Sequence, residues 1–187
     1  MSLRAERAAL ARWNIILIGA RGAGKTSVGR QLAQKLSRPF VYTDERIERL
    51  TGRSVRELFA ERGETAFRDL ESKTLRQALH ENGQVVSVGG GAVLRDENRN
   101  SLHTSGLCVW LTAPAPELAR RVAADPRSAD LRPALTPLSP GGEMQRLLDE
   151  RGPLYAQLAD LTIETSGRDV EQIIDTILAS IDEADAD

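Results

Sequence analysis

The sequence predicts an α/β fold in which a parallel β-sheet carries helices on both faces. Short apolar runs alternate with helical patterns between residues 14 and 181. Strands that alternate with helices in this way favour a parallel sheet. In addition, a glycine-rich segment directly follows the first expected strand and opens the first expected helix. Such a junction is typical of α/β proteins that bind phosphate groups.

The expected strands are short apolar runs, each bounded by polar or glycine-rich segments. The first one holds four consecutive aliphatic residues and ends at Gly19. The third one runs into three consecutive glycines at 89–91. In chain order, the expected strands cover residues 14–19, 40–42, 84–88, 107–111 and 161–164.

Helical patterns occupy the intervals between these runs. Val28, Leu32 and Leu36 recur every four residues and mark the first helix. Further helices are expected over residues 44–50, 54–62, 64–81, 115–123 and 143–158, and a last one carries an isoleucine stripe from 173 to 181. Residues 125–142 hold four prolines and two glycines, and this composition predicts a mobile loop.

Length and composition indicate one soluble domain over residues 1–187, with a core of about 14–181 and frayed termini. The net charge of −2 argues against nucleic-acid binding driven by overall charge. No apolar run is long enough for a membrane helix, and the N-terminus lacks a secretory signal, so we expect a cytoplasmic protein, with a monomer as the simplest assembly. The single cysteine, Cys108, excludes an internal disulfide and is expected to be a buried thiol rather than a nucleophile.

The segment Gly19–Thr26 fits the GxxxxGK[ST] pattern of a phosphate-binding loop. Its glycines allow the backbone to curl around a phosphate, and N–H groups at a helix start attract anions. Lys25 is expected on the terminal phosphates, and the Thr26 hydroxyl is expected on Mg²⁺. The candidate nucleotide-binding residues of this segment are Gly22, Ala23, Gly24, Lys25, Thr26 and Ser27.

Two classes of phosphate-loop protein must then be separated. The guanine-reading Asn-Lys-x-Asp motif of GTPases is absent from the chain. A small-molecule kinase needs a closing lid with arginines, which stabilise the transferring phosphate and exclude water. Arg120 and Arg121 end one expected helix, and Arg132 lies in the proline-rich loop. These arginines favour the kinase.

Candidate acceptor-binding residues follow the expected strands, where ligands of open parallel sheets bind. Asp44 follows the second strand and could orient a hydroxyl and take its proton, or could cap the next helix. Arg68 could bind a carboxylate, or could be an exposed arginine paired with Glu64 or Glu71. Arg151 is expected at a break after a helix, where it binds a second anion or complements the helix C-terminus.

At this point the chain resembles the shikimate kinase family. The resemblance runs from about Asn14 to Ile181, nearly the whole chain, and its motifs agree in order and spacing. They comprise the phosphate loop with Ser27-Val28-Gly29-Arg30, Asp44-x-x-Ile47-Glu48, Thr51-Gly52-Arg53-Ser54-Val55 with Phe59, Gly63-Glu64 with Phe67-Arg68 and Glu71, Gly89-Gly90-Gly91, Arg132-Pro133, Arg151-x-Pro153-Leu154-Tyr155 and Ala159-Asp160.

The resemblance implies a three-layer P-loop sandwich with strand order 2-3-1-4-5, similar to nucleoside monophosphate kinases, and a mobile lid at about 122–142. The implied reaction transfers the γ-phosphate of ATP to the 3-hydroxyl of shikimate and gives shikimate 3-phosphate and ADP, in aromatic amino-acid biosynthesis. ATP with Mg²⁺ and shikimate are therefore the expected ligands.

The family pattern also implies roles for single residues. Asp44 orients and deprotonates the acceptor hydroxyl, Arg68 and Arg151 hold the shikimate carboxylate, and Gly90 offers a backbone contact. Phe59 and Phe67 wall the ring, with ordinary core packing as the alternative. Lys25 and Arg132 neutralise the phosphates, Arg121 stacks on adenine, and Arg168 lies in the adenine-side loop.

The chain departs from the family pattern at two places. Tyr42 replaces the first aspartate of Asp-x-Asp, which normally holds a water on Mg²⁺, and a phenol brings no charge at neutral pH. Strand alternation puts Tyr42 and Asp44 on one side, so Tyr42 is expected deeper, beside Thr26. The lid between Arg121 and Arg132 is also longer than usual, which makes Arg127 a competing lid arginine.

Two alternatives to a shikimate kinase therefore stay open. One is a kinase of the same architecture that acts on another small hydroxy acid. The other is a weakly active or non-catalytic nucleotide-binding homologue, which Tyr42 favours.

Overall fold

The computed structural model describes residues 13–125 and 139–184. Within them the strands form one five-stranded parallel sheet in the order β2-β3-β1-β4-β5. The predicted fold class and strand order are thus confirmed. The strands are β1 (Asn14–Ile18), β2 (Phe40–Tyr42), β3 (Val85–Ser87), β4 (Gly106–Thr112) and β5 (Leu161–Glu164).

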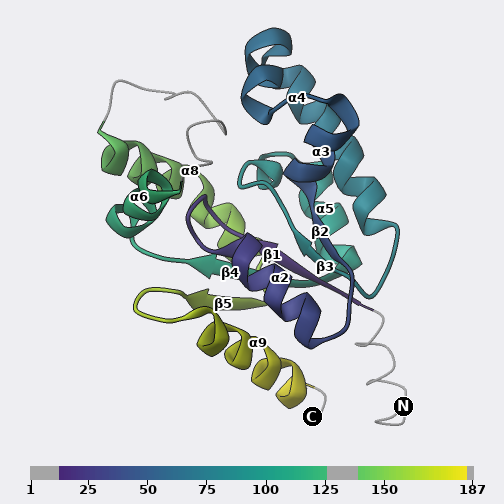
Figure 1. Cartoon of the computed structure of the whole chain (residues 1–187), viewed down its shortest axis with the longest axis vertical. Coiled ribbons are helices and arrows are strands. Elements are labelled where there is room, and N and C mark those ends of the chain that lie inside the picture. The colour runs from purple at the N-terminus through teal and green to yellow at the C-terminus, as the bar shows by residue number, and fades with distance from the viewer. Residues whose placement is uncertain (1–12, 126–138, 185–187) are drawn as a thin grey trace.

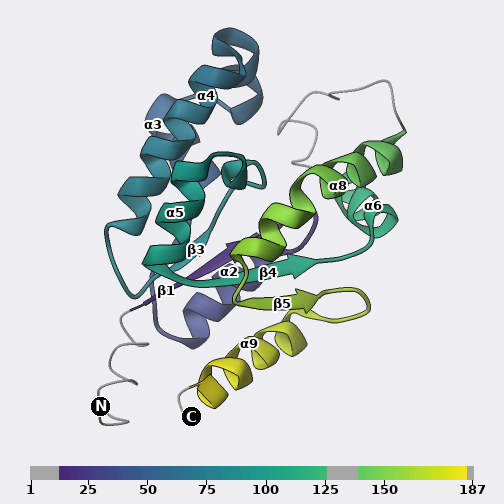
Figure 2. The same ribbon diagram turned by 180° about the vertical axis from the view of Figure 1, so that it is seen from behind.

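The helices follow the expected intervals closely, and they cover both faces of the sheet (Figures 1 and 2). They are α2 (Lys25–Lys35), α3 (Thr43–Thr51), α4 (Val55–Leu79), the 3₁₀ turn η1 (Ala92–Leu94), α5 (Asp96–Ser105), α6 (Ala115–Ala124), α8 (Pro140–Leu158) and α9 (Val170–Ala184). The sequence did not predict η1 and α5. Most of the predicted lid, including Arg127 and Arg132, lies outside the described residues.

Strand alternation divides the core into two layers. Ile15 and Leu17 of β1 point to the face that α2 and α9 cover, in front in Figure 1. Ile16 and Ile18 point to the opposite face, where α4, α5 and α8 pack, as Figure 2 shows. Because β1 is the middle strand and is buried on both faces, its sequence is a continuous aliphatic run.

Helix α3 and the N-terminal part of α4 extend beyond the edge strand β2, while the C-terminal part of α4 packs on the sheet (Figure 1). Ser54 and Glu57 form a capping box that starts α4. At Gly63 the backbone leaves helical geometry with φ of 75° and ψ of 172°, so α4 has a kink where the sequence predicted two separate helices. A small core of Ile47, Val55, Leu58 and Phe67 joins the two helices.

Cys108 lies in the middle of the sheet, in β4, and is fully buried. Burial raises the pKa of its thiol to about 12, and the nearby Asp160 carboxylate acts in the same direction. At neutral pH the thiol is therefore protonated and unreactive. The prediction of a buried core thiol is confirmed.

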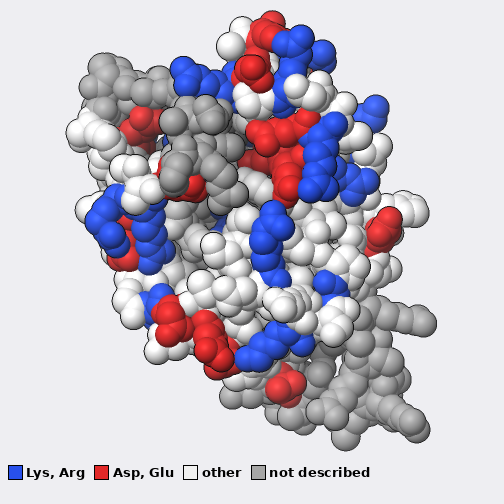
Figure 3. Space-filling view, viewed as in Figure 1, with Lys and Arg blue, Asp and Glu red and all other residues white. Residues whose placement is uncertain are grey.

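On the face shown in Figure 3, the acidic and basic side chains of the described residues are interleaved, most densely around α3 and α4. Exposed ion pairs account for part of this pattern, for example those of Glu45 with Arg30 and with Arg49. Among the described helices, none combines the length and the apolar composition that crossing a membrane requires.

Candidate active site

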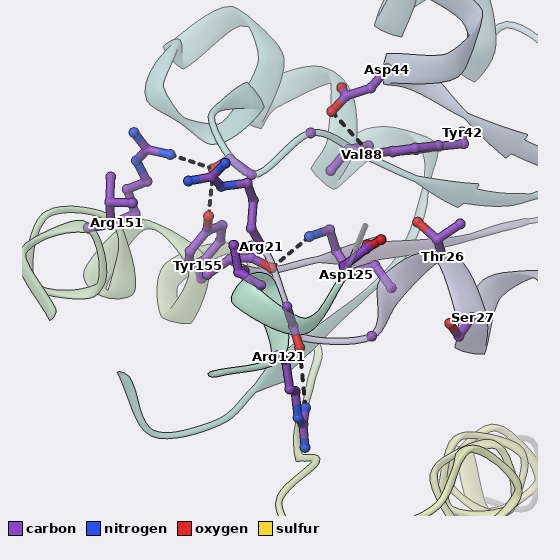
Figure 4. A pocket seen from close by; sticks show the side chains of 18 residues that line it. Arg21, Thr26, Ser27, Tyr42, Asp44, Val88, Arg121, Asp125, Arg151 and Tyr155 are labelled. Carbon is purple, nitrogen blue, oxygen red and sulfur yellow. Dashed lines mark hydrogen bonds between the residues drawn. The ribbon is translucent and has the colours of Figure 1, made fainter. Parts of the chain in front are cut away.

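Three segments that leave the carboxyl ends of neighbouring strands meet at one cavity of about 250 Å³. They are the phosphate loop after β1, the start of α3 after β2 and the glycines after β3. Side chains of α6 and α8 complete the cavity (Figure 4). Of the residues proposed from the sequence, those that line it are Gly22, Gly24, Lys25, Thr26, Ser27, Asp44, Gly90, Arg121 and Arg151.

The phosphate loop depends on glycine for two reasons. Gly19, Gly22 and Gly24 have φ of 132°, 79° and 91°, in the region where other residues are strained. In addition, a Cβ atom at Gly19 would lie 2.3 Å from the carbonyl oxygen of Leu111. A Cβ atom at Gly22 would lie 2.7 Å from that of Leu118. The loop therefore curls tightly against β4 and α6.

Lys25 is the first residue of α2, and its side chain turns back over the loop. Its Nζ donates to the carbonyl oxygens of Gly19 and Ala20, at 2.8 Å each. Gly24 is the N-cap of α2 and has no side chain to cap it. The positive end of the helix thus opens toward the cavity, where an anion would satisfy it. Ala23 does not line the cavity; its side chain is buried and its N–H donates to the Ala20 carbonyl.

Asp44 lies in the first turn of α3 and is 9% exposed. The helix begins at Thr43 with Tyr42 as its N-cap, so the alternative that Asp44 caps the helix is wrong. The premise that strand alternation relates Tyr42 and Asp44 is also wrong, because the strand ends at Tyr42. The two side chains nevertheless meet: the Tyr42 hydroxyl donates to Asp44 Oδ2 at 3.2 Å. Both side chains line the cavity.

The run of three glycines after β3 brings three side chains close to its backbone. A Cβ atom at Gly89 would lie 2.6 Å from Asp44 Oδ1 and 2.8 Å from Glu71 Oε1. A Cβ atom at Gly91 would lie 2.4 Å from both terminal nitrogens of Arg68. A side chain at Gly89 or Gly91 would therefore have to displace these charged groups.

Arg151 projects from the interior of α8, which continues through Pro153 to Leu158. The predicted break is absent, so the alternative role at a helix C-terminus is wrong. Arg151 is 8% exposed, and its Nη1 donates to the Gly90 carbonyl at 3.4 Å. Its buried Nε finds no hydrogen-bond partner among the described residues. A buried guanidinium with an unused donor at a cavity is suited to bind a carboxylate or phosphate.

Arg68 does not line this cavity; it lies beside it, in α4, with 7% of its side chain exposed. Its Nη1 donates to the buried Glu71 carboxylate at 2.5 Å. Longer bonds of 3.3 and 3.4 Å reach Glu64, whose side chain is 64% exposed. The alternative that Arg68 pairs with these glutamates is thus observed, although the arginine itself is buried.

Phe59 and Phe67 pack against each other, with ring centroids 4.4 Å apart, and neither lines the cavity. Phe67 is 1% exposed and belongs to the small core between α3 and α4, as in the core-packing alternative. The Arg68 guanidinium lies over both rings, at 5.7 and 5.4 Å from their centroids. The two rings therefore pack against the Arg68 guanidinium and restrict its position.

Arg121, in α6, connects the phosphate loop to the segment after β5. Its guanidinium donates to the Gly22 carbonyl at 3.3 Å, to the Thr165 hydroxyl at 2.8 Å and to Glu117 at 2.6 Å. Hydrogen bonds of this kind engage the edges of a guanidinium, whose planar faces are suited to stacking. Arg168 is exposed and points along α9, where it donates to the Gln172 carbonyl at 3.1 Å and to Thr176. It does not line the cavity.

Tyr155 and Arg21 are among the cavity residues that the sequence reasoning did not propose. Tyr155, quoted there only as part of a motif, donates to the Gly90 carbonyl at 2.5 Å. Arg21 occupies a variable position of the phosphate loop, and its side chain lines the cavity together with Arg151 and Tyr155 (Figure 4). Burial lowers the pKa of the Arg21 guanidinium, and Arg151 acts in the same direction, while Glu143 and Tyr42 oppose them. The sequence signal that could have identified Arg21 is a basic residue within the phosphate loop.

The charges around the cavity favour anionic ligands. Arg21, Lys25, Arg121 and Arg151 line it, against the carboxylates of Asp44 and Asp125. The loop at Gly19–Thr26 faces the Asp44 carboxylate and the Arg151 guanidinium across one small volume. This arrangement can bring a nucleotide phosphate to a hydroxyl group on an acidic acceptor.

Comparisons with known proteins indicate one family. A family model described as shikimate kinase matches residues 21–182. A shikimate kinase of Rhodopirellula baltica is 42% identical over 176 residues, which cover 92% of this chain and 94% of that protein. One of Symbiobacterium thermophilum is 41% identical over 170 residues, covering 91% and 97%. The solved structure of shikimate kinase from Acinetobacter baumannii in complex with shikimate has a TM-score of 0.87 and 35% identity, and covers 95% of this chain and 97% of that one.

Proposed function

The chain belongs to the shikimate kinase family, and from that premise we propose that it transfers the γ-phosphate of ATP to the 3-hydroxyl of shikimate. The observation that carries the proposal is the single cavity in which Lys25 and the phosphate loop face Asp44 and Arg151. The products are shikimate 3-phosphate and ADP.

On the nucleotide side, we assign the phosphates to the backbone N–H groups of 22–27 and to Lys25. Lys25 Nζ already contacts the loop, so it needs little rearrangement to follow charge onto the leaving phosphate. Arg121, which is held by its edges, offers a face to the adenine ring. Arg132, outside the described residues, is assigned to the phosphates by the family resemblance alone, and Arg168 to the adenine side in the same way.

On the acceptor side, Asp44 takes the proton of the attacking hydroxyl. The carboxylate of shikimate binds Arg151, whose Nε is unused among the described residues. It also binds Arg68, where it replaces the exposed Glu64 and its long hydrogen bonds. Gly90 and Tyr155 fix the backbone between these groups. We add Arg21 as an anion-binding residue between the phosphates and the acceptor.

The residues present fit a magnesium ion that arrives with the nucleotide. Mg²⁺ keeps several waters and takes few protein ligands besides phosphate oxygens. The Thr26 hydroxyl at the start of α2 lines the cavity and would hold it. The described residues hold no cluster of three or more His, Cys, Asp or Glu side chains that would form a separate metal site. When bound, the ion would neutralise charge on the β- and γ-phosphates.

The test is ADP release with MgATP, measured with shikimate, with other hydroxy acids and with no acceptor. We expect release that depends on shikimate, and its loss in Asp44→Asn with ATP binding retained. Replacing the carboxylate of shikimate by a carboxamide should weaken binding by about tenfold or more, since charged hydrogen bonds to two arginines are lost. Faster turnover of another hydroxy acid would favour the first alternative. Tight ATP binding without turnover would favour the non-catalytic homologue that Tyr42 suggests.

A further inference from the structure

Tyr42 contacts the carboxylate of Asp44. Its phenol donates to Asp44 Oδ2 at 3.2 Å, from the last residue of β2 to the first turn of α3 (Figure 4). The contact arises because the chain changes from strand to helix at Thr43, which brings side chains two residues apart together. The Thr43 hydroxyl accepts the Gly89 N–H at 3.2 Å and thereby ties this turn to the end of β3.

The other oxygen of the carboxylate is confined without being hydrogen-bonded. Asp44 Oδ1 is buried and has no hydrogen-bond partner among the described residues. It lies against Gly89, where a Cβ atom would come within 2.6 Å. Among the described residues, the Tyr42 hydroxyl is therefore the one side-chain donor to this carboxylate. Oδ2, held by that hydroxyl, is the oxygen left to face the cavity.

We propose that Tyr42 is a positioning residue for Asp44, an inference that rests on the proposed function. Its hydrogen bond fixes the rotation of the carboxylate so that the second lone pair of Oδ2 points to the acceptor hydroxyl. A general base works only within hydrogen-bond reach of the proton that it takes, so a fixed orientation raises the rate of transfer.

This role differs from that of a residue that holds a metal-bound water. The single hydroxyl proton of Tyr42 is directed to Asp44, and a phenol adds no negative charge for water on a cation. An aspartate at the same position would bring a second carboxylate beside Asp44 and could not donate to it when ionised. The substitution of Asp by Tyr thus exchanges a charge for a hydrogen bond to the base.

The experiment is a double-mutant cycle of Tyr42→Phe and Asp44→Asn in the full-length chain. Tyr42→Phe keeps the ring and removes only the donor, so it should lower kcat by about tenfold. The KM values for ATP and shikimate and the Mg²⁺ concentration at half-maximal rate should not change. In the Asp44→Asn background the same substitution should have no further effect on the residual rate. Thermal melting of each variant checks folding.

Three results would overturn the proposal. The first is a Tyr42→Phe enzyme with unchanged kcat. The second is an equal loss in both backgrounds, which would mean that Tyr42 acts independently of Asp44. The third is a change in the Mg²⁺ concentration at half-maximal rate. It would count if Tyr42→Phe showed it while keeping its kcat, or if a well-folded Tyr42→Asp enzyme reached half-maximal rate at a lower Mg²⁺ concentration than the wild type. That result would assign position 42 to the metal.

A measurement without substrates separates this inference from the proposed function. The NMR resonance of the Asp44 carboxyl carbon, assigned by its loss in Asp44→Asn, should move in Tyr42→Phe in the ligand-free protein. An unmoved resonance would overturn the contact whether or not the protein phosphorylates shikimate. Absence of shikimate-dependent ADP release in the wild-type chain would instead overturn the proposed function alone.

Discussion

Two glycine-rich segments, the phosphate loop at Gly19–Thr26 and the run at 89–91, leave neighbouring strands and reach the same cavity. They use glycine for different reasons. The phosphate loop needs positive φ at Gly19, Gly22 and Gly24, so that its own backbone can surround an anion. The run at 89–91 has no positive φ, and Gly91, for example, has φ of −95°. Its glycines leave space for Asp44, Glu71 and Arg68.

The difference shows that a glycine can be required by its conformation or by a distant side chain. The first requirement is local and is visible as a motif. The second depends on the helices that pack onto the strand end, here α3 and α4. Substitutions in the two segments should consequently affect different ligands, and the following predictions test that separation.

The largest effect is expected for Lys25→Ala in the phosphate loop. The lysine acts on charge that develops during transfer, so its loss should lower kcat by about 10²–10³. The free energy of unfolding should change little. Steady-state kinetics measures kcat, and urea denaturation measures the free energy of unfolding. A variant with near-normal kcat would contradict the role of this loop.

Next in size is Gly91→Ala, which should act as a partial loss of Arg68. The added Cβ would lie 2.4 Å from the guanidinium nitrogens and must displace them. We expect the KM for shikimate to rise by about tenfold, less than the rise of up to about a hundredfold expected for Arg68→Ala, with the KM for ATP unchanged. In the double variant, Gly91→Ala should add little to Arg68→Ala. Equal effects on both substrates would remove Arg68 from the acceptor side.

A smaller effect is expected for Gly89→Ala. Its Cβ would press on the carboxylates of Asp44 and Glu71 rather than on a cation. A displaced base lowers the rate more than binding, so kcat should fall by about tenfold with little change in either KM. If the KM for shikimate rises and kcat does not fall, Gly89 instead leaves space for Glu71, which positions Arg68.

The smallest effect is expected for Gly24→Ala, which tests conformation without crowding. Its φ is 91°, and the nearest atom to an added Cβ is 3.9 Å away, on Val28. We expect a loss of about 1–2 kcal/mol in the free energy of unfolding, the usual cost of the left-handed region. Gly141→Ala in α8, with no positive φ and no atom within 4 Å, is the matched control. An equally large loss in the control would refute the conformational argument.

Much of the fold could be predicted because the buried strands are continuous apolar runs, and because glycine and polar segments separate them from the helices. Helix α5 was missed for a physical reason. Only Asn98 and Leu102 of its residues are buried, so it has no apolar stripe. It is held by contacts such as the Asn98 side chain on the Ala92 carbonyl, at 2.9 Å. Such contacts depend on tertiary packing and leave no periodic pattern.

The site shows the same limit. The phosphate loop and Asp44 could be predicted because they follow strands. The helix around Arg151 was misjudged, because Pro153 removes one backbone donor and suggests a break. Burial of Tyr155 and Leu158 against the sheet keeps the helix intact. The contact of Tyr42 with Asp44 and the crowding at Gly91 are distances between elements, which sequence spacing does not give.

The neighbouring positions of β1 and β3 have a consequence for how this architecture can diversify. Leu17 and Ser87 are paired across the two strands, so the donor loop and the acceptor glycines start one strand spacing apart, about 4.8 Å. That spacing is set by backbone hydrogen bonds and does not depend on side chains. Under the proposed function, the side chains that would select the acceptor come largely from α3, α4 and α8, and their exchange would not alter that spacing. The sheet would therefore keep the distance between the donor loop and the acceptor glycines constant, while the choice of acceptor could change through substitutions in the helices.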